Sequence, residues 1–352
     1  MKFSRRQFLA STLAVSAAFV GYRRLLAPAL AEEARRLGYG PLLRDPAGVL
    51  DLPEDFEYRI LSRAGDVMDD GLFVPGRPDS MAVFPGDDGR LVILRNHELI
   101  TTWAAQGPFG EDNELLDKVA RRDVYDYGGG DTPSVGGTTT LVYDPASGRL
   151  EKQFLSLAGT EINCSGGPTP WGTWISCEET VEKAGEHERD ILGAEARYVH
   201  DRDHGYNFEV VARERKRLTR PRPLTAMGRF KHEAVAVDPR TGIVYQTQDE
   251  RDSLIYRFIP DRRGELHKGG RLQALAFAKE PGRDTRNWPQ GRGLEQSPVE
   301  RKRSYPVRWI DLNDVESPDD TLRLRGHADG AALFARGEGM WFGNGEVYWA
   351  AT

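Results

Sequence analysis

The sequence predicts an all-β protein in which antiparallel hairpins are arranged as blades around one axis, a β-propeller. The 352 residues include 38 Gly and 21 Pro, and many short apolar stretches lie between these turn-forming residues. One strand–turn–strand unit recurs along the chain, which predicts roughly five to six blades with short helical insertions. Because the units are irregularly spaced, a pair of β-sandwiches is the alternative.

The first 31 residues have the pattern of a twin-arginine signal peptide. The pair Arg5-Arg6 precedes a charge-free apolar run over residues 9–20, which is shorter than the about 20 residues that a membrane-spanning helix needs. Residues 29–31, Ala-Leu-Ala, supply a small-x-small cleavage pattern. An amphipathic helix of the folded domain is the alternative. The pattern predicts export by the twin-arginine translocase to the periplasm or the medium, and a mature single domain over residues 32–352.

The predicted hairpins share turns in which Pro presets φ and Gly accepts positive φ. The first strands of these units are expected at Met81–Phe84, Thr138–Tyr143, Ala234–Val237 and Leu254–Phe258. Two stretches, Asn113–Ala120 and residues 182–196, have helix-compatible composition instead. We expect both to form helical insertions between blades.

The net charge and its distribution along the chain argue against nucleic acid as a partner. The net charge is −6, and the basic cluster at Arg213–Arg217 is short and interrupted by Glu214. A solvated loop accounts for this cluster, so the sequence predicts no nucleic-acid binding. No later segment is apolar enough to predict a membrane span in the mature chain.

Side chains that bind metals are concentrated beside strand-like runs that lie far apart in the sequence. These segments are Arg95–Glu98, Asn163–Gly167 with Cys177–Glu179, Lys231–Glu233, and Arg336–Glu338 with Asn344–Glu346, while Asp249-Glu250 is a weaker fifth. In a propeller, each blade brings one or two groups to a shared axis. Several carboxylates meeting there raise one another's pKa unless cations bind. Carboxylate oxygens suit Ca²⁺, and a thiolate adds affinity for a softer transition metal.

The two cysteines, Cys164 and Cys177, allow two interpretations. A disulfide is the default for an exported chain. Export in the folded state means folding in a reducing cytoplasm, where a metal can capture a thiolate instead. Strand alternation also requires Glu178 and Glu179 to face opposite sides, so that only one can reach a central site, and Cys177 shares the face of Glu179.

The stretch from Asn163 to Glu179, Asn-Cys-Ser-Gly-Gly-Pro-Thr-Pro-Trp-Gly-Thr-Trp-Ile-Ser-Cys-Glu-Glu, closely resembles the hallmark of the PhoX-type alkaline phosphatases. Residues 136–140, Arg229–Ala234 and Arg336–Gly339 resemble the same family in the same order, and the likeness spans Leu52 to Thr352. The resemblance implies a β-propeller with an axial cluster of Fe³⁺ and Ca²⁺ that hydrolyses small phosphate monoesters.

Site residues follow from the resemblance position by position. It implies an iron-ligating thiolate at Cys164, which favours metal binding over a disulfide. It implies carboxylate ligands at Glu179, Glu233 and Glu338. The implied phosphate contacts are Arg336 and, on a weaker match, Asn96 and His97.

The resemblance also leaves alternatives. Family members are expected to continue past the strand around Trp341–Glu346, so the chain is expected to end before the closing blade of the family. One alternative function is a calcium-dependent propeller of lactonase or phosphotriesterase type. Another is a non-catalytic binding propeller.

Overall fold

The computed structural model describes residues 38–130, 132–191, 194–286 and 299–352. The chain divides into two compact units, Met1–Leu61 and Ser62–Thr352. In the described part of the first unit, a single bridge joins Leu43 to Leu52. The predicted signal peptide lies outside the described residues.

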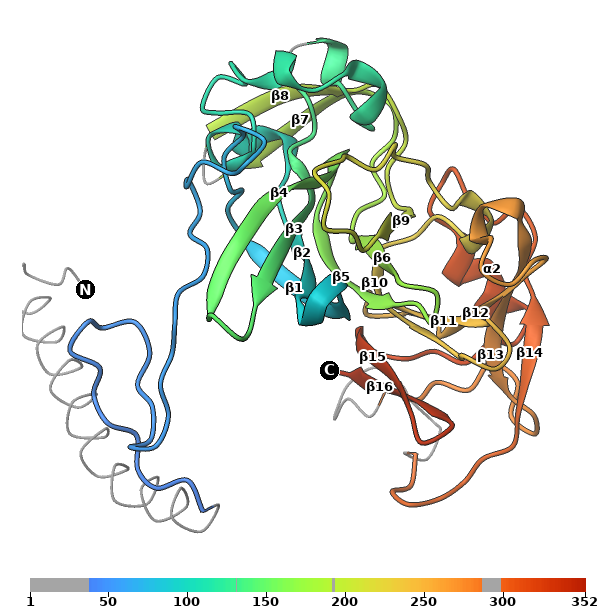
Figure 1. Ribbon diagram of the computed structural model, residues 1–352. Coiled ribbons are helices and arrows are strands. Elements are labelled where there is room, and N and C mark those ends of the chain that lie inside the picture. The colour runs from blue at the N-terminus through green and yellow to red at the C-terminus, as the bar shows by residue number, and fades with distance from the viewer. Residues whose placement is uncertain (1–37, 131, 192–193, 287–298) are drawn as a thin grey trace, which may run out of the picture. The chain divides into compact units, whose positions relative to one another are not determined.

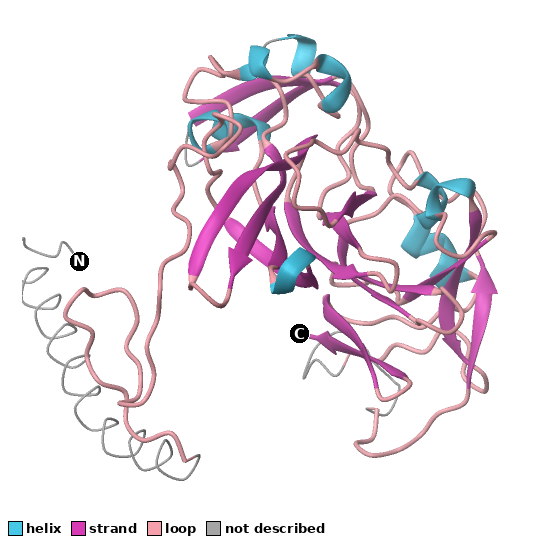
Figure 2. Ribbon diagram, viewed as in Figure 1, coloured by secondary structure: helices cyan, strands magenta, loops and turns pink. Residues whose placement is uncertain are grey.

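Antiparallel sheets form the framework of the second unit, and loops and short helices connect them (Figures 1 and 2). Within the described residues, hydrogen-bonded neighbours follow the orders β1-β2-β3-β4, β5-β6-β9, β7-β8, β10-β11-β12-β13-β14 and β15-β16. The strands up to β8 are β1 (Pro78–Pro85), β2 (Leu91–His97), β3 (Gly136–Asp144), β4 (Arg149–Thr160), β5 (Asn163–Pro168), β6 (Thr173–Glu178), β7 (Gly185–Ile191) and β8 (Ala194–His200). The later strands are β9 (Asn207–Val211), β10 (His232–Val237), β11 (Val244–Gln248), β12 (Tyr256–Pro260), β13 (Gly270–Phe277), β14 (Val307–Asp311), β15 (Gly337–Gly343) and β16 (Glu346–Ala351).

Helices are short and connect the strands (Figure 2). The 3-10 helices are η1 (Asp87–Gly89), η2 (Thr101–Gln106), η3 (Leu116–Lys118), η4 (Arg121–Asp123), η5 (Gly128–Gly130), η6 (Thr225–Met227) and η7 (Leu266–Lys268). The described α-helix is α2 (Leu322–Ala328). The mostly-β fold class is therefore confirmed.

The predicted hairpins form, and their turns show why. Asp144 is the last residue of β3, and its carboxylate accepts the backbone N–H groups of Ala146 and Ser147 in the turn to β4. In the turn between β10 and β11, Asp238 accepts the N–H of Arg240 at 2.9 Å. These Asx turns stabilise a tight reversal at the point where each strand ends.

The helical prediction for residues 182–196 is wrong, because much of this segment belongs to the β7–β8 hairpin. His187 is paired with Tyr198 in the register, and their rings stack at 5.3 Å between centroids. On the same pair of strands, Glu188 forms an ion pair with Arg197 at 2.7 Å. Such cross-strand pairs stabilise a hairpin whose composition alone suits a helix. The segment Asn113–Ala120 contains only the one-turn helix η3.

Buried apolar side chains fill the spaces between the sheets. One cluster joins β5 and β6 to β10–β13 and includes Ile175, Val235 and Phe258. Another lies between the first sheet and β9, with Leu94, Leu157 and Val210. Consecutive sheets therefore pack face to face through their apolar residues, while their strand ends remain available for polar groups.

None of the helices in the described part of the chain combines the length and the apolar character that crossing a membrane requires.

Candidate functional site

Four sheets in the described part of the chain begin with the same backbone arrangement. The first strand of each sheet contains a β-bulge directly after its first residue, seen as a register shift against the second strand. The second residue of the first strand lies in the bulge. These residues are Asp79 on β1, Cys164 on β5, Glu233 on β10 and Glu338 on β15. A bulge re-aims a side chain away from the regular pleat, so each sheet presents one such group at the same end.

The residue directly after each second strand completes the arrangement. These residues are Glu98, Glu179, Asp249 and Thr352. Their backbone N–H groups donate to the carbonyl oxygens of Arg77, Ile162, Lys231 and Arg336, at 2.9, 2.9, 3.3 and 3.1 Å respectively. Each carbonyl belongs to the residue two positions before the bulged one. The same hydrogen bond therefore fixes two side chains per sheet next to each other.

The first strands lie against one another, β1 against β5, β5 against β10, and β10 against β15 (Figure 1). This contact brings distant residues together: ligand atoms of Cys164, Glu179 and Glu233 all lie within 4.8 Å of one another. We use the name acid cluster for this group and the acidic residues that act on it electrostatically. Its members are Asp79, Glu98, Cys164, Glu179, Glu233, Asp249 and Glu338.

Crowding of these groups changes their protonation. Burial raises the pKa of Glu179 to about 8, and the carboxylates of Glu233 and Asp249 add to the shift. Burial likewise raises the pKa of Glu233 to about 7, with a further contribution from Glu338. Burial and the nearby Glu233 raise the pKa of the Cys164 thiol well above its usual value. Crowding and burial therefore disfavour the charged forms of these carboxylates unless cations bind.

Both cysteines are free thiols in the structure. The Cys164 thiol lies 3.4 Å from the carbonyl oxygen of His232, while Cys177 is fully buried in the apolar core. The predicted alternation also holds at the end of β6. Glu178 turns to the opposite side from Glu179 and hydrogen bonds with His204.

Arg336 lies at the edge of the acid cluster. Its Nε and Nη2 atoms donate to the two carboxylate oxygens of Asp249 at 2.9 and 2.8 Å, and Nη2 is 3.3 Å from Glu338. Its side chain is 48% exposed. Its backbone is left-handed, with φ 41°. Arg77 occupies the equivalent position before β1, with φ 44°, and contacts Glu98 at 3.5 Å.

The structure does not place Asn96 and His97 in the acid cluster. Asn96 is fully buried, donates to the carbonyl of Ser165, and accepts from Trp174 and Ser176. The two nitrogens of the buried His97 lie 2.8 Å from the Gly76 carbonyl and 2.9 Å from Thr139 Oγ1. These contacts join strands. The role of both residues as phosphate contacts stays a prediction.

Asp79 was not predicted, and Glu98 and Asp249 were predicted only as parts of candidate metal-binding segments. A signal was present, because Asp79, Glu233 and Glu338 each stand as an acid at the start of a strand-like run. Cys164 occupies the same position in β5. Because it is not an acid, the repeated position is not evident from the sequence.

The family model for alkaline phosphatase PhoX matches residues 37–352. The chain belongs to the PhoX alkaline phosphatase family. A solved structure of Pseudomonas fluorescens PhoX, in complex with vanadate, a transition state analogue, is similar in fold, with 18% sequence identity and a TM-score of 0.51. The match covers 84% of this chain and 64% of that chain, so this PhoX family member spans less than two thirds of that length. No match was found among curated proteins.

Proposed function

We propose that this PhoX family member is a metal-dependent phosphomonoesterase and that the acid cluster is its active site. The observation that carries the proposal is the convergence of Cys164, Glu179 and Glu233, from three separate strand ends, within 4.8 Å. These residues lie near Arg336, whose side chain is half-exposed. A guanidinium in this position suits a substrate with a doubly charged phosphate group.

The repeated strand starts support a β-propeller as the detailed architecture. The first strands β1, β5, β10 and β15 contact one another in chain order, as the inner strands of successive blades do. The equivalent bulges and hydrogen bonds make these four sheets copies of one structural unit.

The residues fit the metals that the family implies. Several half-buried carboxylates form an oxygen-rich site for Ca²⁺, and Cys164 adds a thiolate that can bind a transition metal such as iron. We assign Cys164, Glu179, Glu233 and Glu338 as ligands, with Asp79, Glu98 and Asp249 as further carboxylates of the site. Bound cations supply Lewis acidity, charge neutralisation and a nucleophile available at moderate pH.

The protein's own groups position the ester. Arg336 presents a planar guanidinium that can hold two phosphate oxygens at once. Asp249 fixes its orientation through the two-point contact described above. Because phosphoryl transfer depends mainly on positioning and on stabilising the charge of the oxygens, we expect Arg336 to contribute to both binding and turnover.

We also propose that the enzyme is exported from the cytoplasm. The Arg5-Arg6 pair, the apolar run and the Ala-Leu-Ala pattern support a periplasmic or secreted enzyme that folds and loads metal before translocation.

The test is phosphate release by the purified, metal-loaded chain from p-nitrophenyl phosphate, compared with a phosphotriester and a lactone. We expect hydrolysis of the monoester. Replacing Glu233→Gln should lower kcat/KM by more than ~100-fold, because even outer partners of metal ligands contribute 10- to 100-fold. The exposed Glu346 begins β16, at the opposite end of that strand from Thr352 and the acid cluster. Glu346→Gln is therefore the matched control and should leave the rate unchanged. Hydrolysis of only the triester or the lactone would show a different reaction, and no hydrolysis of any substrate would support a binding protein.

A further inference from the structure

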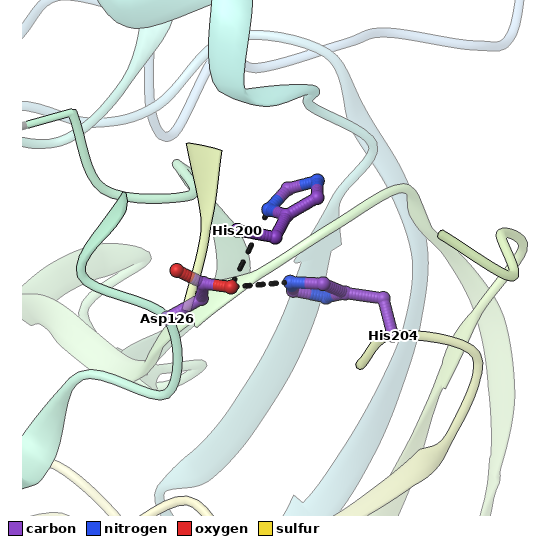
Figure 3. A group of neighbouring side chains, drawn as sticks. All are labelled: Asp126, His200 and His204. Carbon is purple, nitrogen blue, oxygen red and sulfur yellow. Dashed lines mark hydrogen bonds and ion pairs between the residues drawn. The ribbon is translucent and has the colours of Figure 1, made fainter. Parts of the chain in front are cut away.

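A second cluster of metal-binding side chains lies on the other side of β6. Asp126, His200 and His204 are almost completely buried, and ligand atoms of all three lie within 4.8 Å of one another (Figure 3). The Oδ2 atom of Asp126 is 3.1 Å from His204 Nε2 and 3.3 Å from His200 Nδ1. Both imidazoles therefore point one nitrogen at the same carboxylate oxygen.

The other nitrogen of each imidazole is held by a second carboxylate. His204 Nδ1 lies 2.7 Å from Glu178 Oε1, and His200 Nε2 lies 2.9 Å from Glu182 Oε2. Glu178 is itself fixed, because its Oε2 accepts the backbone N–H groups of Gly205 and Tyr206. Histidines that bind a metal are oriented in this way by a carboxylate on the remote ring nitrogen.

Two buried polar atoms beside the cluster lack a hydrogen bond among the described residues. They are His200 Nδ1, which faces Asp126, and Glu161 Oε2, which lies 3.6 Å from His200 Nε2. His200 is 2% exposed and Glu161 is 1% exposed, so water does not readily satisfy them. Buried polar atoms without a hydrogen bond are rare. His200 Nδ1 faces the Asp126 carboxylate at 3.3 Å without forming one, and a cation could bind both atoms there.

The spacing indicates which cation. Tetrahedral zinc with bonds of about 2.0–2.1 Å separates its donor atoms by roughly 3.3 Å, and the two nitrogen–oxygen distances here are 3.1 and 3.3 Å. Two imidazole nitrogens and one carboxylate oxygen suit a first-row transition dication. Ca²⁺ needs more oxygen donors at longer distances.

We propose that Asp126, His200 and His204 form a structural site for a transition-metal dication such as Zn²⁺, separate from the acid cluster. Asp126 follows η4, His200 ends β8, and His204 lies in the loop before β9. The ion would therefore join the end of β8 and the loop that leads into β9 to the segment after η4, which is hydrogen-bonded to β4 through Asp126 and Gly159. The backbone is built for this closeness: Gly205 has φ 110°, and a Cβ there would lie 2.6 Å from the Thr180 carbonyl oxygen.

Crystals of the wild-type chain grown with Zn²⁺ test the site directly through anomalous scattering at the zinc edge. We expect a peak at bonding distance from His204 Nε2, His200 Nδ1 and Asp126 Oδ2. The absence of a peak at this position would overturn the proposal, and the cluster would then be a hydrogen-bonded network of imidazoles and carboxylates.

Variants provide an independent measurement. Asp126→Asn and His204→Gln should each bind one Zn²⁺ fewer per chain than the wild type and should lose the increase in Tm that Zn²⁺ causes. Glu346→Gln, which changes an exposed residue outside both clusters, is the control. It should keep the zinc content of the wild type and the increase in Tm that Zn²⁺ causes. Folded variants with unchanged zinc content would contradict the site. Should the variants fail to fold, the wild-type crystals decide alone. Phosphate release is not among these readouts, so the result is independent of the proposed phosphatase activity.

Discussion

Two neighbouring residues at the end of β6 take part in different clusters. Glu179 reaches the acid cluster, whereas Glu178 accepts hydrogen bonds from the loop that carries His204. Side chains alternate between the two faces of a strand, so this division follows from position alone. It was predictable that only one of the pair could reach a central site, and the structure identifies that residue as Glu179.

The two cysteines should differ in their effects on metal content. Cys164→Ser removes the sulfur next to Glu179 and Glu233, and we expect loss of bound iron and a fall in monoester turnover by more than ~10-fold. Cys177→Ser is the matched control, because Cys177 is also buried but does not belong to the group of Cys164, Glu179 and Glu233. It should affect mainly stability, measured by thermal unfolding. Full iron content and turnover in Cys164→Ser would refute the assignment of the thiolate.

Buried His97 should make the protein sensitive to acid. Burial lowers its pKa to about 3, against an ordinary value of 6.5. The unfolded chain therefore binds a proton at a higher pH than the folded protein does, and the free energy of unfolding falls as the pH drops from about 6.5 towards 3. We expect a smaller fall in His97→Gln than in the wild type, with His267→Gln as the control. Denaturant unfolding across this pH range measures the free energy of unfolding of each protein. Identical pH dependence in all three proteins would show that His97 does not cause the loss of stability in acid.

At the scale of secondary-structure elements, the bulged strand start is the repeated unit. The hairpins were predictable because Asp-Pro and Gly turns have local signals, as at Asp144 and Asp238. The β7–β8 hairpin was not predictable from the sequence, because its stability depends on cross-strand pairs such as Glu188 with Arg197. Bulges were not predictable either, since a register shift depends on how two strands pair.

Gly166 should be essential for the bulge that positions Cys164. A Cβ at this residue would lie 1.9 Å from the carbonyl oxygen of Ile175, on the strand opposite. We expect Gly166→Ala to lower the free energy of unfolding by about 2 kcal/mol or more, since the backbone of β5 must shift. At Gly339, near the bulge of β15, a Cβ meets nothing within 4 Å. Gly339→Ala is therefore the control in denaturant unfolding, and equal stability of the two variants would contradict this role for Gly166.

At the scale of the whole unit from Ser62 to Thr352, the contacts among β1, β5, β10 and β15 create the candidate site. The sequence predicted that distant strand ends supply its groups, and three of the four predicted metal ligands lie together. Asp79 and the cluster of Asp126, His200 and His204 were not predicted. Their members are isolated in the sequence, and only the packing of sheets and loops brings them together.

The central claim is that the acid cluster holds cations. Elemental analysis of iron and calcium per chain, in protein exported by its own signal, tests this claim most directly. We expect both metals in the wild type and in Glu346→Gln, and a marked loss of bound metal in Glu233→Gln. A folded wild type that contains neither metal, or a Glu233→Gln variant with the metal content of the wild type, would contradict it.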